Sequence, residues 1–110
     1  MNTRQEFLEE VADRNLVCAR VGFDDENYGR TPKWFVLREG YTAQEFNQFL
    51  DYLDFDYDEG YGSQELFGVI LFEDSYSDRF EYDGSEAWDN HKMPSAAEVM
   101  ETSQEKVEEN

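Results

Sequence analysis

The sequence predicts an α+β domain, in which two helices cover one face of a four-stranded antiparallel sheet in the order α-β-β-α-β-β. Two segments open with a helix-capping pattern and continue with apolar residues at helical spacing. Four others are rich in the β-branched, aliphatic and aromatic residues of strands, and turn residues separate them. The 110 residues have room for one domain, expected over residues 1–93, followed by an acidic tail or short helix over 94–110.

The first half of the predicted domain is a helix followed by a β-hairpin. The residues from Thr3 to Glu6 fit a capping box, and the apolar spacing after them predicts a helix from about Arg4 to Arg14. Leu16 to Phe23 and Pro32 to Glu39 have strand composition, with a turn-like run between them. We expect these two strands to pair with each other.

The second helix is indicated by its start and by its apolar spacing. Thr42 and Glu45 fit a second capping box. Apolar side chains then follow at the i, i+3, i+4, i+7 positions of an amphipathic helix, which we expect from Ala43 to about Asp54. One face of this helix should therefore pack against the sheet.

Two further strands are predicted after this helix. Leu66 to Phe72 is a nearly continuous apolar run, which favours a central strand buried on both faces. Glu73 to Asp78 is interpreted as a polar turn and Arg79 to Tyr82 as the fourth strand. Ser85 to Met93 shows no clear period.

Negative charge is concentrated in the second half of the chain. The formal net charge is -18, beyond the ~2–8 charges that solubility alone requires in a small domain. The segment from Met1 to Arg38 has seven acidic and six basic residues, whereas Glu39 to Asp89 has fifteen acidic residues and one base, Arg79. Such a field attracts cationic partners and repels nucleic acid and anionic membranes.

The composition also indicates a cellular compartment. Cys18 is the only cysteine, so no internal disulfide is possible, and a buried, inert thiol in a reducing compartment is the favoured interpretation. No apolar run approaches the ~20 residues of a membrane span, and the N-terminus is too acidic for a signal or transit peptide. We therefore expect a cytoplasmic protein.

The acidic side chains suggest imitation of a DNA backbone. Neighbouring phosphates of one strand are roughly 6–7 Å apart, and residues i and i+2 of an extended chain are about 6.6 Å apart on one face. Tyrosines between the carboxylates are candidate anchors, because interface cores are rich in aromatic residues. The predicted partner-binding residues are Asp51, Asp54, Asp56, Asp58, Glu59, Glu73, Asp74, Asp78, Glu81, Asp83 and Glu86, with Tyr57, Tyr61 and Tyr76 as anchors. The alternative is a solvated acidic surface without a specific partner.

A calcium loop is a second interpretation of the same stretch. Asp54, Asp56, Asp58 and Glu65 occupy positions 1, 3, 5 and 12 of an EF-hand loop. Position 6, where the sharp turn needs glycine, is Glu59, and a strand is predicted after the loop instead of a helix.

An enzyme is not expected. With one His and one Cys, the chain offers no confident nucleophile and base arrangement, no Cys/His metal spacing and no Gly-rich phosphate loop. His91 is interpreted as a surface or capping residue. No cofactor is predicted.

Part of the sequence resembles a recurring pattern in small acidic proteins of phages and mobile elements. The pattern is carried by Gly60 to Gly62, Gln64 to Gly68, Arg79, Glu81 to Glu86 and Trp88. The resemblance implies a mobile-element origin, and such proteins have no settled activity. By size and charge the chain also resembles phage DNA mimics, which block restriction enzymes, CRISPR effectors or host DNA-binding regulators.

These observations favour a non-catalytic inhibitor that occupies the nucleic-acid site of a basic host defence protein. The first alternative is an immunity protein or antitoxin that neutralises one basic toxin, which a pull-down returning a single toxin would indicate. The second is a calcium-binding module, for which millimolar calcium, but not magnesium, should raise the melting temperature.

Overall fold

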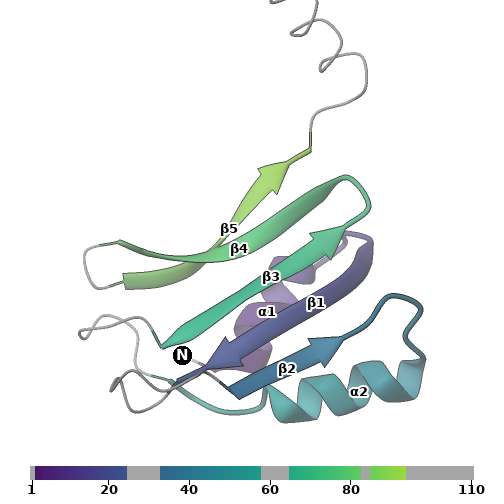
Figure 1. Ribbon diagram of the computed structural model, residues 1–110, viewed down its shortest axis with the longest axis horizontal. Helices are drawn as coiled ribbons and strands as arrows, with labels where there is room; N and C mark the ends of the chain where they lie inside the picture. Colours follow the sequence, from purple (N-terminus) through teal and green to yellow (C-terminus); the bar gives the residue numbers. More distant parts are fainter. Residues whose placement is uncertain (1, 25–32, 58–64, 83–84, 94–110) are drawn as a thin grey trace, which may run out of the picture.

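The described part of the chain folds as two helices and a five-stranded antiparallel sheet, which confirms the α+β class (Figure 1). The computed structural model describes residues 2–24, 33–57, 65–82 and 85–93. The expected tail over 94–110 lies outside these residues. The elements are α1 (Thr3–Val11), β1 (Leu16–Phe23), β2 (Lys33–Leu37), α2 (Ala43–Tyr52), β3 (Leu66–Phe72), β4 (Ser75–Tyr82) and β5 (Ser85–Lys92).

The strand order across the sheet is β2-β1-β3-β4-β5, and all neighbouring strands are antiparallel. The predicted pairing of the first two strands is confirmed, with Val21 opposite Phe35. The predicted central strand is also confirmed, because β3 lies third of five. The first hairpin and the last three strands therefore meet at the β1–β3 pair.

The prediction of four strands is wrong, because Ser85–Lys92 forms a fifth. Trp88 is the one apolar residue among its positions on the helix side, and the others are Glu86, Asn90 and Lys92, so the strand shows no apolar period. The predicted turn from Glu73 to Asp78 is also wrong beyond its first two residues, since β4 begins at Ser75. Ser75 and Ser77 are buried, and their hydroxyl groups bond Asn90 in β5. These strand positions thus hold buried, hydrogen-bonded serines instead of the apolar residues by which a strand is recognised from sequence.

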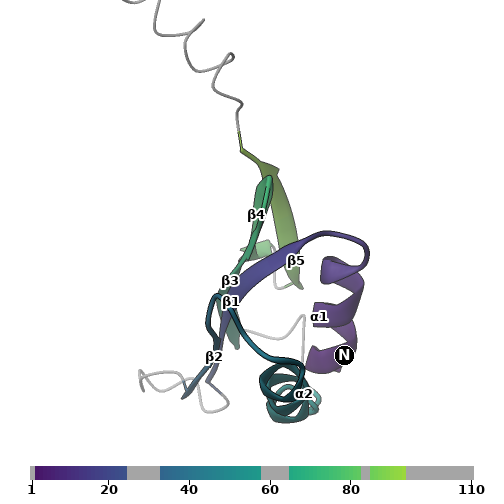
Figure 2. The same ribbon diagram turned by 90° about the vertical axis from the view of Figure 1, so that its right-hand side faces the viewer.

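Both helices lie on the same side of the sheet, as Figure 2 shows. The core between the layers includes Phe7 of α1 and Phe49 of α2, whose rings meet edge-to-face at 5.3 Å. Ile70 of β3 is fully buried beneath the helices, whereas its neighbour Val69 is 49% exposed on the other face. The expectation that β3 is buried on both faces is therefore wrong, because both described helices lie on the same face of the sheet and Val69 is exposed on the other.

The helix starts differ from each other. Thr42 caps α2, and Thr42 and Glu45 form the predicted capping box through bonds of 3.0 and 3.1 Å. In α1 the cap is Asn2 instead of Thr3: the Asn2 Oδ1 accepts from the Gln5 amide at 2.9 Å, and Thr3 is buried. This shift frees the Glu6 carboxylate from a capping role. Neither helix in the described part of the chain is long and apolar enough to cross a membrane.

A glycine in β3 allows a tryptophan of the edge strand β5 to pack closely against the neighbouring strands. Gly68 of β3 has φ +150°, and a Cβ atom there would lie 2.3 Å from the Arg20 carbonyl oxygen and 3.1 Å from the Trp88 ring. Trp88 lies opposite Arg79 in the β4–β5 pair and reaches across β4 to this glycine. The absence of a side chain at Gly68 thus makes room for the indole.

Candidate functional site

The sheet face opposite the helices, here called the open face, presents side chains from all five strands. Across β3, β4 and β5, the register places Val69, Asp78 and Asp89 in one row and Leu71, Tyr76 and His91 in the next. Phe80 lies two residues beyond Asp78 on the same face. The name open patch is used below for this set: Val69, Tyr76, Asp78, Phe80, Asp89 and His91.

The open patch combines exposed apolar and acidic side chains. Val69 is 49% exposed and Phe80 is 42% exposed, although both are large hydrophobic residues. The side chains of Asp78 and Asp89 are 42% and 52% exposed. Exposed apolar residues gathered in one patch and bordered by polar groups are typical of interaction surfaces.

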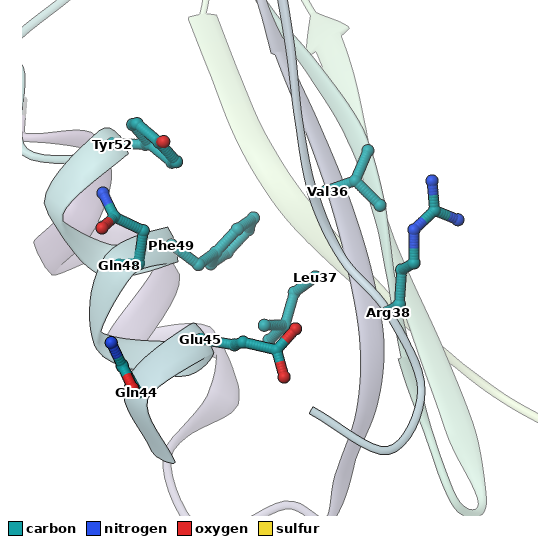
Figure 3. Close-up of a pocket in the computed structure, with 8 residues that line it drawn as sticks. All are labelled: Val36, Leu37, Arg38, Gln44, Glu45, Gln48, Phe49 and Tyr52. Atoms are coloured by element: carbon teal, nitrogen blue, oxygen red, sulfur yellow. The ribbon is translucent and has the colours of Figure 1, made fainter. Parts of the chain in front are cut away.

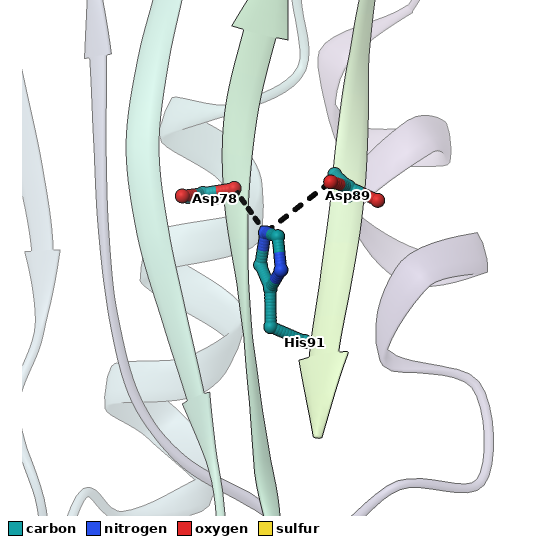
Figure 4. Close-up of side chains that lie close together, drawn as sticks. All are labelled: Asp78, Asp89 and His91. Atoms are coloured by element: carbon teal, nitrogen blue, oxygen red, sulfur yellow. Dashed lines mark hydrogen bonds and ion pairs between the residues drawn. The ribbon is translucent and has the colours of Figure 1, made fainter. Parts of the chain in front are cut away.

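A histidine links the two carboxylates of the open patch (Figure 4). His91 Nε2 lies 3.0 Å from Asp78 Oδ1 and 3.2 Å from Asp89 Oδ2. The His91 ring stacks on Tyr76, with the ring centroids 4.9 Å apart. His91 is therefore a surface residue, as expected, but its ring is held between three side chains of two neighbouring strands.

The β1–β2 half of the open face is basic and apolar. The Arg20 guanidinium lies 3.9 Å from the centre of the Trp34 ring, a cation–π contact. Beside it is a hollow of about 410 Å³, whose lining includes Cys18, Val36 and Leu71. Cys18 is partly exposed, so the expectation of a buried thiol is wrong.

A second hollow lies between α2 and the β2 edge, with a volume of about 320 Å³ (Figure 3). Gln44, Glu45 and Gln48 line it from the helix, and Arg38 and Val36 point away from the helix. The Glu45 carboxylate already belongs to the capping box of α2. The hollow therefore has no evident chemical role.

The predicted partner-binding residues lie in several separate places. Asp51 is exposed on α2. Asp54 and Asp56 follow α2, and the carboxylate of each accepts a hydrogen bond from the side-chain Nδ2 of Asn2, at 3.2 and 3.1 Å. Glu73 and Asp74 are exposed in the β3–β4 turn, Glu81 is exposed on β4, and Tyr76 and Asp78 belong to the open patch. Asp58, Glu59, Tyr61 and Asp83 lie outside the described residues.

Glu86 was predicted to imitate a phosphate, but the structure buries it. It is 4% exposed, and its oxygens accept hydrogen bonds from the Glu65 and Leu66 amides at 2.8 and 3.0 Å. Its Oε1 also lies 3.4 Å from Arg79 Nη2. Glu86 therefore holds the start of β3 and balances a buried arginine, so it cannot face a partner.

Tyr57, predicted as an anchor, is buried in the same network. Its hydroxyl donates to Glu6 Oε1 at 2.6 Å and accepts from Arg79 Nη2 at 2.9 Å. Arg79 Nη1 lies 3.1 Å from Glu6 Oε2, an ion pair without hydrogen-bond geometry. The pKa of the Tyr57 phenol is raised well above its ordinary value, mainly by burial and to a smaller extent by the hydrogen bond to Glu6.

This buried network was missed by sequence reasoning, although one signal pointed to it. Arg79 is the only base between Glu39 and Asp89. A lone arginine among fifteen carboxylates, within a strand, has many potential partners for a buried ion pair. The side chain of Arg79 is in fact 1% exposed.

The surroundings of the calcium candidate differ from an EF-hand. β3 begins directly after Glu65, where an EF-hand has a helix. The Asp54 and Asp56 carboxylates bond Asn2, and Asp58 lies outside the described residues. A helix-loop-helix arrangement is therefore absent around the described ends of this segment.

No protein-family model matches the chain, and comparisons with curated proteins and with solved structures found no similar protein.

Proposed function

We propose that the protein is a non-catalytic inhibitor that binds a basic, nucleic-acid-binding protein of its host, such as a restriction enzyme, a CRISPR effector or a DNA-binding regulator. The open patch supplies the contact surface. The observation that supports this most is the placement of half-exposed Val69 and Phe80 beside Asp78 and Asp89 on the helix-free face. Apolar groups supply contact area, and carboxylates select a cationic partner.

The contacts that basic residues make within the chain support the same proposal. Arg79 is buried against Glu6 and Glu86, Arg14 pairs with Glu10, and Arg20 stacks on Trp34. Within the described ranges, the exposed side chains of Asp51, Asp54, Asp56, Glu73 and Asp74 form no ion pair with a lysine or arginine. The surface charge is thus left for an external partner to neutralise.

Carboxylates of the described residues occur in close pairs, which concentrates negative charge. Asp78 and Asp89 are opposite each other on neighbouring strands, where Cα atoms are about 4.5–5.5 Å apart. Asp54 and Asp56 are also close, because both bond one nitrogen. Neighbouring phosphates on one DNA strand are roughly 6–7 Å apart. The carboxylate oxygens of Asp78 and Asp89 lie within 4.8 Å of one another, so this pair would present a denser negative charge than two phosphates to a groove lined with lysine and arginine.

A mobile-element origin and action in the host cytoplasm complete the proposal. They follow from the sequence pattern around Gly60 to Gly62 and Glu81 to Glu86, and from the charge and cysteine usage described above.

The test is affinity capture from host lysate at low salt, followed by a salt gradient and by competition with duplex DNA. Three baits are compared: the wild type, the Asp78→Asn/Asp89→Asn variant of the open patch, and Glu73→Gln/Asp74→Asn in the β3–β4 turn. The two variants remove the same charge from different places. Captured proteins should be basic, should elute as salt rises, and should be displaced by DNA.

The comparison between baits decides whether the open patch is the contact surface. Capture should fall at least 10-fold with the open-patch variant and stay near the wild-type level with the turn variant. Equal loss from both variants would show that only net charge matters and would overturn the assigned surface. Captured proteins that are neither basic nor displaced by DNA would overturn the mimicry, and a single basic toxin unaffected by DNA would indicate an immunity protein instead.

A further inference from the structure

We propose that Asp78, Asp89 and His91 form a binding site for a divalent transition metal ion, of which Zn²⁺ is the best-matched probe. The three side chains project from β4 and β5 on the open face (Figure 4). Their donor atoms, two carboxylate oxygens and one imidazole nitrogen, lie within 4.8 Å of one another. This site shares Asp78, Asp89 and His91 with the open patch, but its test requires no protein partner, so its outcome can be distinguished from that of the proposed inhibitory function.

Two of the three distances between the donor atoms, those from the nitrogen to each oxygen, match the distances around a metal. When metal–ligand bonds are about 2.0–2.1 Å, adjacent ligand atoms are roughly 3.3 Å apart in a tetrahedral site and roughly 3.0 Å apart in an octahedral site. His91 Nε2 lies 3.0 Å from Asp78 Oδ1 and 3.2 Å from Asp89 Oδ2. The nitrogen and each oxygen can therefore reach one ion with small side-chain rotations.

The strands hold the three ligands in place before any ion binds. Asp78 and Asp89 are register partners in the β4–β5 pair, and His91 lies two residues after Asp89 on the same face. Stacking on Tyr76 restricts rotation of the His91 ring. A site on regular strands loses less conformational freedom on binding than one on a loop.

The donor set selects a class of metal. Imidazole nitrogen suits Zn²⁺, Cu²⁺, Ni²⁺ and Fe²⁺, whereas Ca²⁺ and Mg²⁺ prefer sites made of oxygen ligands. Two carboxylates also neutralise the charge of a divalent ion. Because the Asp78, Asp89 and His91 side chains are 42%, 52% and 39% exposed, the remaining coordination positions face solvent, where water or a side chain from another protein can bind.

The test is a Zn²⁺ titration of the full chain by isothermal calorimetry, with side-chain NMR signals of His91 as a second readout. His91→Phe removes the ligand nitrogen but keeps a ring to stack on Tyr76. Asp78→Asn and Asp89→Asn each remove one carboxylate, and Asp74→Asn is the matched control in the β3–β4 turn. Cys18→Ser tests whether the thiol contributes, and circular dichroism verifies that each variant is folded.

The expected result is one Zn²⁺ per chain with a shift of the His91 signals. His91→Phe should abolish this binding, Asp78→Asn and Asp89→Asn should each weaken it at least 10-fold, and Asp74→Asn and Cys18→Ser should leave it unchanged. The proposal is overturned if His91→Phe binds Zn²⁺ like the wild type, if Asp74→Asn weakens binding as much as Asp78→Asn, or if Ca²⁺ binds the same site equally well. Each of these outcomes would indicate diffuse attraction to acidic residues.

Discussion

Arg79 Nη2 lies 3.4 Å from Glu86 Oε1, and the two side chains are 1% and 2% exposed. Glu86 also accepts the two backbone amides at the start of β3, while Arg79 reaches Glu6 of α1 and the Tyr57 hydroxyl. One buried arginine therefore connects the last hairpin, the start of the central strand and the first helix. The predictions below begin with this connection.

Replacing Glu86 should be among the most destabilising single changes at an acidic residue of this protein. Glu86→Ala removes the carboxylate that accepts from the Glu65 and Leu66 amides and that lies beside the buried Arg79. We expect a loss of about 3–5 kcal/mol in the free energy of unfolding, measured by urea denaturation. Glu73→Ala, at an exposed position, should change it by less than ~0.5 kcal/mol. Similar values for the two variants would contradict the structural role of Glu86.

Tyr57 should make stability depend on pH in the alkaline range. Its pKa is raised above the ordinary 10.0, so the folded state holds the phenolic proton more tightly than the unfolded state. This stabilisation is complete below about pH 10 and is lost as pH rises towards the folded pKa, with a slope of ~1.4 kcal/mol per pH unit. Urea denaturation at pH 8 to 11 measures the slope. Tyr57→Phe should abolish it, whereas Tyr52→Phe, at a residue 53% exposed, should retain it.

Gly68 should tolerate no side chain. Position 68 has φ +150°, and Gly68→Ala places a Cβ 2.3 Å from a carbonyl oxygen of β1. We therefore expect the free energy of unfolding, measured by thermal denaturation, to fall by about 2–5 kcal/mol. Gly40→Ala is the matched control, since Gly40 has φ +83° and open space around it, and should cost about 1–2 kcal/mol. Equal losses would mean that backbone conformation alone, without the close approach, explains both positions.

Asn2 should stabilise the protein partly by separating charges. Asp caps helices as well as Asn does, but Asn2→Asp removes the amide that bonds Asp54 and Asp56 and adds a third carboxylate beside them. We expect the free energy of unfolding to fall by about 1–2 kcal/mol at low salt. Most of this decrease should disappear at 1 M NaCl, because the Debye length falls to about 3 Å. Asn2→Ser keeps a capping oxygen without the charge, so its loss should not depend on salt. Denaturant titrations at both salt concentrations provide the measurement.

The elements that were predicted correctly from sequence have an apolar face or a standard cap. β1 and β3 were located because Val21 and Ile70 belong to dense apolar runs. α2 was located because Thr42 and Glu45 form a true capping box. The start of β4 was missed because Ser77, although fully buried, is polar, and its hydroxyl donates to Glu10 of α1. A local pattern cannot show that a buried polar residue will have a hydrogen-bond partner 67 positions away.

The candidate site depended on information that only the folded chain provides. Asp78 was named from its charge, but its meeting with Asp89 and His91 requires the register between β4 and a strand that was not predicted. Glu86 and Tyr57 were selected because of their residue types. In the folded chain both are buried, where they contact the buried Arg79 side chain. Residue type identified the chemistry of the surface, whereas strand pairing determined which residues share it.

The two tryptophans report on different sides of the molecule. Trp88 is buried against Gly68 and Arg79, and Trp34 is partly exposed on the open face beneath Arg20. Replacing one tryptophan at a time by phenylalanine would leave a single tryptophan in each variant, and its emission can be excited at wavelengths that the seven tyrosines do not absorb. Emission from Trp88 would then follow melting of the interior, while quenching of Trp34 by iodide or acrylamide would follow access to the outer surface, so the chain carries its own pair of optical probes.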